Sequence, residues 1–545
     1  MAMKIPKSGF TQLLKDGYKH LQGVDEAVLR NIAAIKELTQ ITRTSLGPNG
    51  RNKMVINHLE KLFVTNDAAT IIKELEVIHP AAKLLVMASQ QQEAEMGDAT
   101  NLIIVFAGEL LQHAEYLLKM GLHPSDIIEG YRAASKSCLE ILEQISVESV
   151  KNPNNEADLL KIVNTAIASK QYGYEDLLSK HVVEAALTVM PKNPSNFNVD
   201  SIRVVKILGG SIHDTKVVKG MVFGREPESV VTKATKAKVA IFTCPLDVAL
   251  TETKGTVLIH NANEMLNFSK GEESKLEEVI REIADSGAKV IVTGSGIGEL
   301  ALHFANRYNL LVVKILSKFD LRRLCRVTGA TALTRLGAPM AEEMGYCEIV
   351  ETVEIGSDRC TVFRQEDEAT KTATIVIRGG TQNSIDDIER AIDDGVNVIK
   401  AVAKDSRLLA GAGASEIELA RQLQILSEKT PGLNQYGIKK FAEALEVIPR
   451  TLAENAGLDS TEVISKLYAA HAQGQSAAGV DIESEDNGIL DAKAKGIFDA
   501  LAAKRFALKL ATHAALTVLS VDQIIMSKPA GGPKVKENKD WDEDD

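Results

Sequence analysis

The sequence is poor in aromatic residues and contains no long hydrophobic run. Aromatic side chains make up 4% of its 545 residues, and tryptophan occurs once. Because hydrophobic residues still reach 45%, the cores must be built mainly from alanine, leucine, isoleucine and valine, which favours a helix-rich architecture. A chain of this length is typical of about three or four domains of roughly 150 residues each.

Cysteines are few and widely separated, and a membrane segment is missing from the sequence. No C-x-x-C pair occurs among Cys138, Cys244, Cys325, Cys347 and Cys360, which argues against a zinc site and a disulfide framework. Nowhere do eighteen apolar residues run together, and charges interrupt the first seventeen residues, so we expect neither a membrane span nor a signal peptide. These features indicate free thiols and a cytoplasmic protein with no membrane partner.

Excess positive charge and the common phosphate-binding motifs are also missing. The net charge is −11, and acidic and basic residues mix along the chain apart from the acidic end at 537–545. Without a basic stripe we predict no nucleic-acid partner. Neither G-x-x-x-x-G-K-[ST] nor a kinase glycine loop with its V-A-I-K partner occurs, so the usual signatures of a nucleotide site fail.

The most informative short segment is Gly-Asp-Ala-Thr-Asn at residues 97–101, directly before the apolar segment 102–118. Unpaired backbone N–H groups and the positive end of the helix dipole collect at such a helix start, where a protein can hold phosphate. The carboxylate of Asp98 would repel phosphate directly but suits a magnesium ion that bridges phosphate oxygens. The alternative is that this segment is an ordinary helix N-cap.

Both ends of the chain show helical periodicity, whereas the middle third alternates strands with helices. Apolar residues recur at helical spacing in 25–41 and 385–402. The turn at 47–50 precedes a predicted hairpin and a helix at 68–75 that Asp67 can cap. Short β-type runs occur at 239–242, 257–259, 290–292 and 310–315. We therefore interpret the helical ends as one kind of domain divided by an insertion, and expect disorder in the tail at 528–545.

Asp394 lies outside the apolar stripe of the predicted helix at 385–402. It follows Ile392 by two residues, about 200° round a helix, so its side chain points away from the packing face. Periodicity alone favours a solvated acidic face here, and a functional carboxylate is the alternative.

Five motifs, in the same order along the chain, resemble those of the group II chaperonins. The family's T-S-L-G-P-x-G appears at 44–50, N-D-G-A-T at 66–70, H-P-A-A-K-L-L at 79–85, G-D-G-T-T at 97–101 and G-G-G-A at 411–414. Segments 64–70, 268–273 and 528–533 resemble one subunit type of the eukaryotic cytosolic chaperonin, called CCT or TRiC.

This resemblance implies the chaperonin fold, a multidomain fold of α and α/β type. It implies a mainly helical equatorial ATPase domain at 1–143 and 405–527 and a small α/β intermediate domain at 144–210 and 370–404. The α/β apical domain, with a lid extension, would occupy 211–369.

The resemblance also implies the activity and the partners. The chain would be an ATP-dependent protein-folding chaperone subunit, acting with other CCT subunits in a hetero-oligomeric double ring of eight subunits per ring. ATP hydrolysis would close domains and lid around unfolded or partly folded cytosolic proteins such as actin and tubulin. The implied cofactors are ATP/ADP and Mg²⁺.

Matched position by position, the resemblance implies a role for individual residues. Asp98 would bind magnesium, Asp394 would polarise the attacking water with Asp67 nearby as a second acidic group, and Asp499 would bond the ribose. The other residues expected around the nucleotide are Leu46, Gly47, Pro48, Ala99, Thr100, Asn101, Ser169, Lys170, Gly411, Ala412 and Gly413.

The chain departs from the family pattern at several positions of these motifs. Alanine stands in place of glycine at Ala68, Ala99 and Ala412, and Asn101 replaces a threonine. A methyl group is tolerated cheaply only where the backbone does not need left-handed geometry. The rate of hydrolysis is therefore open, and a nucleotide-binding structural ring subunit with very slow hydrolysis is the alternative function. A small-molecule kinase on an unfamiliar fold is a third possibility, which predicts a monomer.

In the apical domain, the family's client-binding helix would begin near residues 319–323. Its mixed apolar and basic character would suit partly folded clients with acidic patches. The alternative is that Phe319 and Leu321 pack in the domain core. The lid extension would fall within 251–275, on the strength of the resemblance alone.

Overall fold

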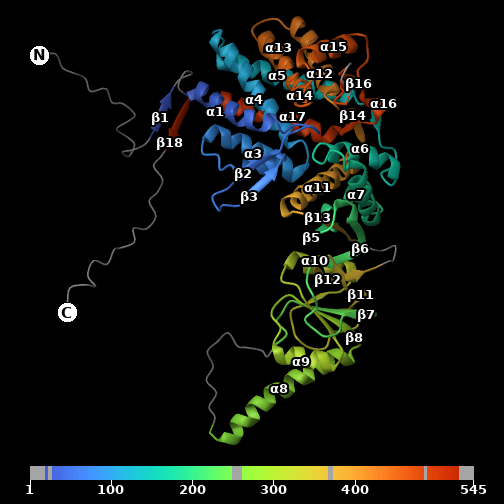
Figure 1. Ribbon diagram of the computed structural model, residues 1–545. Helices are drawn as coiled ribbons and strands as arrows, with labels where there is room; N and C mark the ends of the chain where they lie inside the picture. Colours follow the sequence, from blue (N-terminus) through green and yellow to red (C-terminus); the bar gives the residue numbers. More distant parts are fainter. Residues whose placement is uncertain (1–18, 23–26, 248–259, 366–371, 484–487, 527–545) are drawn as a thin grey trace, which may run out of the picture.

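The computed structural model describes residues 19–22, 27–247, 260–365, 372–483 and 488–526. Figure 1 shows an elongated molecule, in which helices from both ends of the chain gather in one part and the middle of the sequence forms the opposite part. A smaller group of helices and strands lies between these two parts.

The helical part is built from the first and the last third of the chain. It contains α1 (Leu29–Arg43), α2 (Ala68–Glu74), α3 (Pro80–Glu95), α4 (Thr100–Lys119), α5 (Pro124–Gln144), α12 (Ala414–Lys429), α13 (Asn434–Leu445), α14 (Val447–Asn455), α15 (Ser460–Ala472), α16 (Ala492–Lys495) and α17 (Leu501–Leu519).

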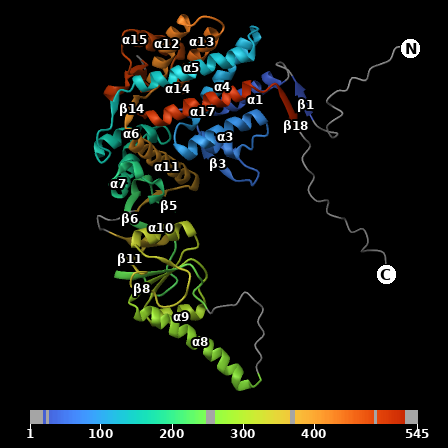
Figure 2. The same cartoon turned by 180° about the vertical axis from the view of Figure 1, so that it is seen from behind.

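Helix α4 is the centre of this part, because α1, α3, α13 and α17 all pack against it. In Figure 2, seen from behind, α17 runs close to α4, although the two are distant in sequence. Phe106 of α4 and Phe441 of α13 meet edge to face with ring centroids 5.4 Å apart, a favourable aromatic geometry. Gly130 of α5 and Gly437 of α13 allow close contact, since a Cβ atom on either glycine would lie 2.9 Å from the other's Cα.

Short strands connect distant segments of the helical part. They are β1 (Lys19–Gln22) with β18 (Gln523–Met526), the hairpin of β2 (Lys53–Ile56) and β3 (Leu62–Thr65), the sheet β17–β14–β4 (Phe498–Ala500, Arg407–Ala410 and Glu148–Ser149), and β15 (Ala478–Val480) with β16 (Ile489–Asp491). The β17–β14–β4 sheet joins the C-terminal third to the segment that follows α5.

The group between the two large parts packs three helices on the edge of a sheet. Helices α6 (Glu156–Ala168), α7 (Glu175–Val189) and α11 (Gln382–Lys404) share a buried core with β5 (Ile202–Leu208) and β13 (Ala373–Gly379). Three short 3₁₀ helices, η3 (Pro194–Asn196), η4 (Val199–Ser201) and η5 (Ile212–Asp214), lie in the connections around β5.

The middle of the chain continues this sheet in the order β5–β13–β6–β12–β11–β7–β8–β9, with β10 beside β7. Its further elements are β6 (Lys216–Phe223), β7 (Lys233–Phe242), α8 (Ala262–Asp285), β8 (Ala288–Thr293), α9 (Glu299–Arg307), β9 (Leu311–Lys314), α10 (Lys318–Thr328), β10 (Ala332–Leu333), β11 (Gly345–Ile355) and β12 (Asp358–Arg364).

Alternate residues of the central strands face different helices, as the two-residue repeat of a strand requires. Val290 and Val292 of β8 join the core that contains α10, whereas Ile291 joins the core that contains α8 and α9. The parallel pairs β7–β8 and β8–β9 are therefore covered on both faces, which explains their continuous apolar runs.

Most expected elements are confirmed, with a few differences. The hairpin and the strands expected at 239–242, 290–292 and 310–315 are present as β2–β3, β7, β8 and β9. The helix expected at 25–41 is present as α1, which begins at Leu29, and residues 25 and 26 lie outside the described residues. The antiparallel strands β6, β11 and β12 were not expected, because their patterns mix exposed and buried positions. The tail, the expected strand at 257–259 and part of the expected lid segment lie outside the described residues, and the rest of that segment belongs mainly to α8.

Among the helices that the structure describes, none is both long and apolar enough to cross a membrane.

Candidate functional site

A cavity of about 770 Å³ lies where the N-terminal helices, α6, α11 and the C-terminal third meet. All residues expected around a nucleotide line it except Gly411. Gly411 lies directly beside it, since its N–H donates to the carbonyl of Ile497 at 3.0 Å. The cavity therefore collects residues from motifs that are hundreds of positions apart in the sequence.

The segment 97–101 forms a left-handed turn at the start of α4. Ala99 is the N-terminal boundary residue of α4, with φ 63° and ψ 26°, and no side chain caps the helix. The carboxylate of Asp98 instead accepts the N–H of Ala99 at 2.6 Å, and Gln92 donates to the carbonyl of Asp98 at 2.8 Å. The interpretation of this segment as an ordinary N-cap is therefore wrong, and the N–H groups of the first turn have no side-chain cap.

The backbone is left-handed at two of the three positions where alanine stands in place of a glycine of the family. Ala99 and Ala412 have φ 63° and 55°, whereas Ala68 lies in α2, where a methyl group causes no strain. A non-glycine residue in the left-handed region costs roughly 1–2 kcal/mol. The backbone thus adopts the left-handed geometry in spite of the methyl groups.

Asn101, which replaces a threonine of the family, ties α4 to the end of α1. Its amide nitrogen donates to the carbonyl of Thr42 at 3.3 Å and to the hydroxyl of Ser45 at 3.2 Å. On the same side of the cavity, Asn455 donates to the carbonyl of Leu46 at 2.8 Å. The turn that contains Gly47 and Pro48 is therefore held against α14.

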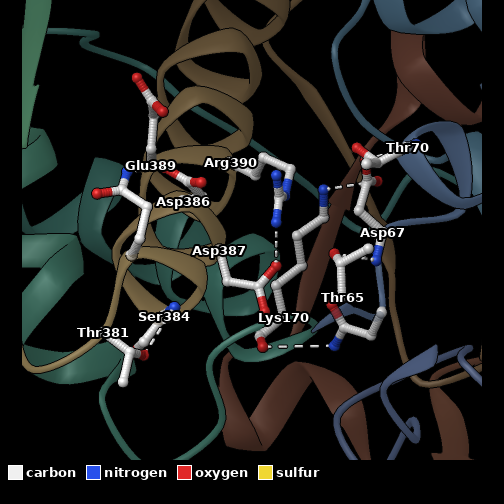
Figure 3. Close-up of polar contacts among 12 residues, drawn as sticks. Thr65, Asp67, Thr70, Lys170, Thr381, Ser384, Asp386, Asp387, Glu389 and Arg390 are labelled. Atoms are coloured by element: carbon white, nitrogen blue, oxygen red, sulfur yellow. Dashed lines mark hydrogen bonds and ion pairs between the residues drawn. The ribbon is translucent and has the colours of Figure 1, made fainter. Parts of the chain in front are cut away.

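Lys170 joins the two acidic residues that were expected to assist hydrolysis. Its ammonium lies 3.0 Å from Asp67 Oδ1 and 2.5 Å from Asp394 Oδ2. Asp67 also accepts the N–H of Thr70 at 3.1 Å and its hydroxyl at 2.7 Å, so the expected cap of α2 is confirmed. Figure 3 shows Lys170 reaching toward Asp67 between α11 and the start of α2.

Asp394 is 5% exposed, so the interpretation of this position as a solvated face is wrong. Burial, together with the charges of Asp98 and Asp67, raises the pKa of Asp394, and the Lys170 ammonium opposes this rise. Burial alone would also raise the pKa of Asp67, but Lys170 and the hydrogen bonds from Thr70 lower it to about 2. Lys170 stays charged, because both carboxylates raise its pKa more than burial lowers it.

The charges of this group fit a bound cation. Asp67 and Asp394 share the Lys170 ammonium, and Asp98 lines the same cavity, where burial raises its pKa above the usual value. In the described part of the chain, no group of three or more His, Cys, Asp or Glu side chains is arranged to hold a metal ion. Magnesium can be held by one or two carboxylates when phosphate oxygens and water complete its shell, and Asp98 is the residue that could hold it here.

Several cavity residues were missed by the reasoning from sequence. They include Glu416 of α12, Lys504 of α17, and Val480, Asp481, Ile482 and Glu483 at the β15–β16 connection. The position of Lys504 could have been noticed in the sequence, because this charged residue lies between the apolar segments 500–503 and 507–508. A charged residue inside an apolar helix face is normally paired when it is buried.

The helix that was expected to bind clients corresponds to α10, and the two apolar residues at its start, Phe319 and Leu321, differ in exposure. Phe319 is 75% exposed, whereas Leu321 is 5% exposed. Packing in the core is therefore confirmed for Leu321 and wrong for Phe319.

Comparison with known proteins agrees with the motifs. Residues 38–529 match the model of the TCP-1/cpn60 chaperonin family. The chain is 58% identical over its full length, and over all of the relative, to a probable T-complex protein 1 subunit theta from Schizosaccharomyces pombe. It is 56% identical to T-complex protein 1 subunit theta from Dictyostelium discoideum, over 98% of this chain and all of the relative. The human theta subunit is 55% identical over the full length of both chains.

The resemblance to one CCT subunit type is thus confirmed, and that type is theta. The chain belongs to the TCP-1/cpn60 chaperonin family.

Proposed function

We propose that the chain binds ATP and magnesium in the 770 Å³ cavity and hydrolyses ATP as a chaperonin subunit. The observation that supports this most is the meeting of Asp98, from the start of α4, and Asp394, from α11, in one cavity. Phosphoryl transfer needs positioning and neutralisation of charge more than covalent chemistry. The start of α4 offers N–H groups for the phosphates and the Asp98 carboxylate for magnesium, and α11 offers the Asp394 carboxylate for water.

In this mechanism Asp98 would hold the metal, and the N–H groups at the start of α4 would bind phosphate oxygens. Magnesium, when bound, neutralises charge on the phosphate oxygens. Asp394 orients the attacking water and accepts its proton, for which a raised carboxylate pKa is favourable. In the described conformation the Lys170 ammonium forms an ion pair with Asp394. Before hydrolysis, Lys170 must therefore turn toward the phosphates or share the Asp394 carboxylate with the water.

We infer further that hydrolysis is coupled to domain movement. We propose the division into an equatorial domain at 1–143 and 405–527, an intermediate domain at 144–210 and 370–404, and an apical domain at 211–369. The water-orienting Asp394 then belongs to a different domain from Asp98. A movement that brings the two carboxylates to one nucleotide would link ATP hydrolysis to closure of the chamber.

The names of the relatives support assembly with other T-complex subunits, and we propose that this assembly is cytoplasmic. We propose a double ring of eight subunits per ring that encloses unfolded proteins such as actin and tubulin. Phe319, exposed on α10, is the side chain that we propose to contact such clients.

A second candidate function is a nucleotide-binding ring subunit with very slow hydrolysis. The left-handed Ala99 and Ala412 favour it, because strain in a phosphate-binding turn can displace the groups that hold the transition state.

Nucleotide binding can be tested within the assembled ring by hydrogen exchange with mass spectrometry, which distinguishes this subunit from its neighbours. We expect ATP with magnesium to protect the first turn of α4, and Asp98→Ala to abolish that protection. Asp522→Ala removes an exposed carboxylate far from the motif and should leave the protection unchanged. Equal protection in the Asp98→Ala ring would contradict the proposed site.

Native mass measurement provides the matching test of assembly, since a stable monomer of 59.0 kDa would instead favour a small-molecule kinase.

A further inference from the structure

Lys504 is a buried charge in the lining of the cavity that the proposed mechanism does not use. Its side chain, on the first turn of α17, is 9% exposed. Its ammonium lies 2.6 Å from Asp499 Oδ2 and 2.8 Å from Glu416 Oε1, and it donates to the Ser415 hydroxyl at 2.7 Å. All three hydrogens of the ammonium can therefore be used, which is the condition for keeping such a charge buried.

The partners of Lys504 come from two elements that flank the cavity. Asp499 is in β17, and Ser415 and Glu416 form the first turn of α12, directly after the turn 411–413. Gly411 lies close to the same carboxylate, because a Cβ atom on this glycine would be 3.5 Å from Asp499 Oδ2. One ammonium thus fixes the distance between β17 and the start of α12.

The charges around Lys504 leave one carboxylate oxygen of Asp499 for another partner. Glu416 is 2% exposed, and its charge balances that of the Lys504 ammonium. The carboxylate of Asp499 is therefore a second negative charge beside one positive charge. The Asp499 side chain is 34% exposed and lines the cavity. Oδ2 is bonded to Lys504, which leaves Oδ1 as an acceptor that can bind a hydroxyl group.

We propose that Lys504 is a positioning residue that holds the Asp499 carboxylate for a hydrogen bond from a ribose hydroxyl of the bound nucleotide. The inference rests on the proposed function, in which Asp499 faces the ribose. Without the ammonium, Glu416 and Asp499 repel each other, and the Asp499 side chain regains its rotational freedom. The selectivity of the site for ribonucleotides over deoxyribonucleotides then falls, whereas contacts to the phosphates and the base remain.

The variants must separate positioning from loss of folding. Replacing Lys504 alone leaves Glu416 buried without a counter-charge, which is strongly destabilising. The double variant Lys504→Met with Glu416→Gln removes both charges and keeps similar volumes. The single variant Lys504→Arg keeps a positive charge at this position. Lys509→Met, at an exposed position of the same helix, is the matched control.

The experiment compares ATP, 2′-deoxy-ATP and 3′-deoxy-ATP in the assembled ring. The readout is the nucleotide concentration that gives half-maximal protection from hydrogen exchange in residues 411–420 of this subunit. A hydrogen bond to a charged group corresponds to about 10- to 100-fold in affinity, so the unsubstituted chain should prefer ATP over one deoxy analogue by that factor. In the double variant we expect a preference below about threefold, caused by weaker binding of ATP alone. Lys504→Arg should recover part of the preference, and Asp499→Asn should add no further loss to the double variant.

Different outcomes separate this inference from the proposed function. If the double variant binds all three nucleotides equally more weakly, Lys504 contacts a shared group or only supports the fold, and the inference is overturned. It is also overturned if the unsubstituted chain binds ATP and both analogues equally, although nucleotide binding then stands. No protection by ATP in the unsubstituted chain would overturn both.

Discussion

Replacing Ala99 by glycine changes a single methyl group at the start of α4 and separates the two candidate functions. Ala99 holds φ 63° and ψ 26°, and its N–H donates to Asp98. If the turn already has its working geometry, glycine should relieve strain without altering the positions of Asp98 and the N–H groups of α4. If instead the methyl group displaces the turn, glycine should restore fast hydrolysis.

The expected size of the effect follows from the backbone of Ala99. Left-handed geometry costs alanine about 1–2 kcal/mol, and the greater freedom of glycine in the unfolded chain offsets about 0.4–1 kcal/mol of the relief. Loss of the half-buried methyl group removes a few tenths of a kcal/mol more, at roughly 25 cal/mol per Å². We therefore expect the turn to be stabilised by about 0.5 kcal/mol. Because the strain is present before and after nucleotide binds, the hydrolysis rate should change by less than about threefold.

The assay combines local opening free energy, from hydrogen exchange at the first turn of α4, with single-turnover hydrolysis in the assembled ring. Ala133→Gly, in the exposed middle of α5, makes the same chemical change at a helical position and should destabilise its helix by about 1 kcal/mol. A rise of tenfold or more in hydrolysis by Ala99→Gly would show that the methyl group displaces the turn and would favour the slow structural subunit. Destabilisation by Ala99→Gly as large as in the control would refute the strain itself.

Three further predictions concern buried charges. Lys170→Met leaves Asp67 and Asp394 without their shared ammonium. It should lower the free energy of unfolding, measured in urea, by about 3–5 kcal/mol. The double variant Lys170→Met with Asp67→Asn should recover most of that loss. The pKa of Asp67 is about 2, below its ordinary 3.8, so its stabilisation is complete above about pH 4 and is lost as the pH falls to about 2. Acid unfolding followed by circular dichroism should lose that part of its pH dependence in Asp67→Asn. Asp320 of α10 pairs with Arg203 of β5 at 3.0 Å and with Arg323 of its own helix at 3.1 Å. Asp320→Asn should accelerate hydrogen exchange of α10 by about tenfold or more, whereas unchanged exchange would show that these ion pairs do not hold α10.

Local elements and the gathering of the motifs could be predicted from the sequence. The capping of α2 by Asp67 and the β2–β3 hairpin depend on neighbouring residues, and local patterns report such contacts. The cavity residues were found because ordered motifs carried the resemblance, and one cavity collects almost all of them.

The backbone of Ala99 could not be predicted, because its conformation depends on tertiary contacts. Alanine prefers helical or extended geometry, and local preference gives no reason for φ 63°. The turn is fixed by the hydrogen bond from the Ala99 N–H to the Asp98 carboxylate. It is also fixed by Asn397 of α11, which packs directly against Gly97. Packing of distant segments overrides the preference of one residue.

The burial of Asp394 escaped the periodicity argument for a similar reason. Position relative to the apolar stripe predicts solvent contact, but Lys170 arrives from the end of α6 and pairs with the carboxylate. Lys504 was missed in the same way, since its partners lie in β17 and α12. Sequence patterns show which face of a helix is apolar, and only the fold shows which charges meet on the other faces.

The most direct measurement is single-turnover hydrolysis of ATP by this subunit in the assembled ring with Asp394→Asn. Asp393→Asn, on the adjacent exposed position of α11, serves as the control. If Asp394 activates the attacking water, its substitution should lower hydrolysis by about 10² to 10⁴ while ATP still binds, and the control should stay near the unsubstituted rate. Equal rates in the two variants would contradict hydrolysis at this carboxylate.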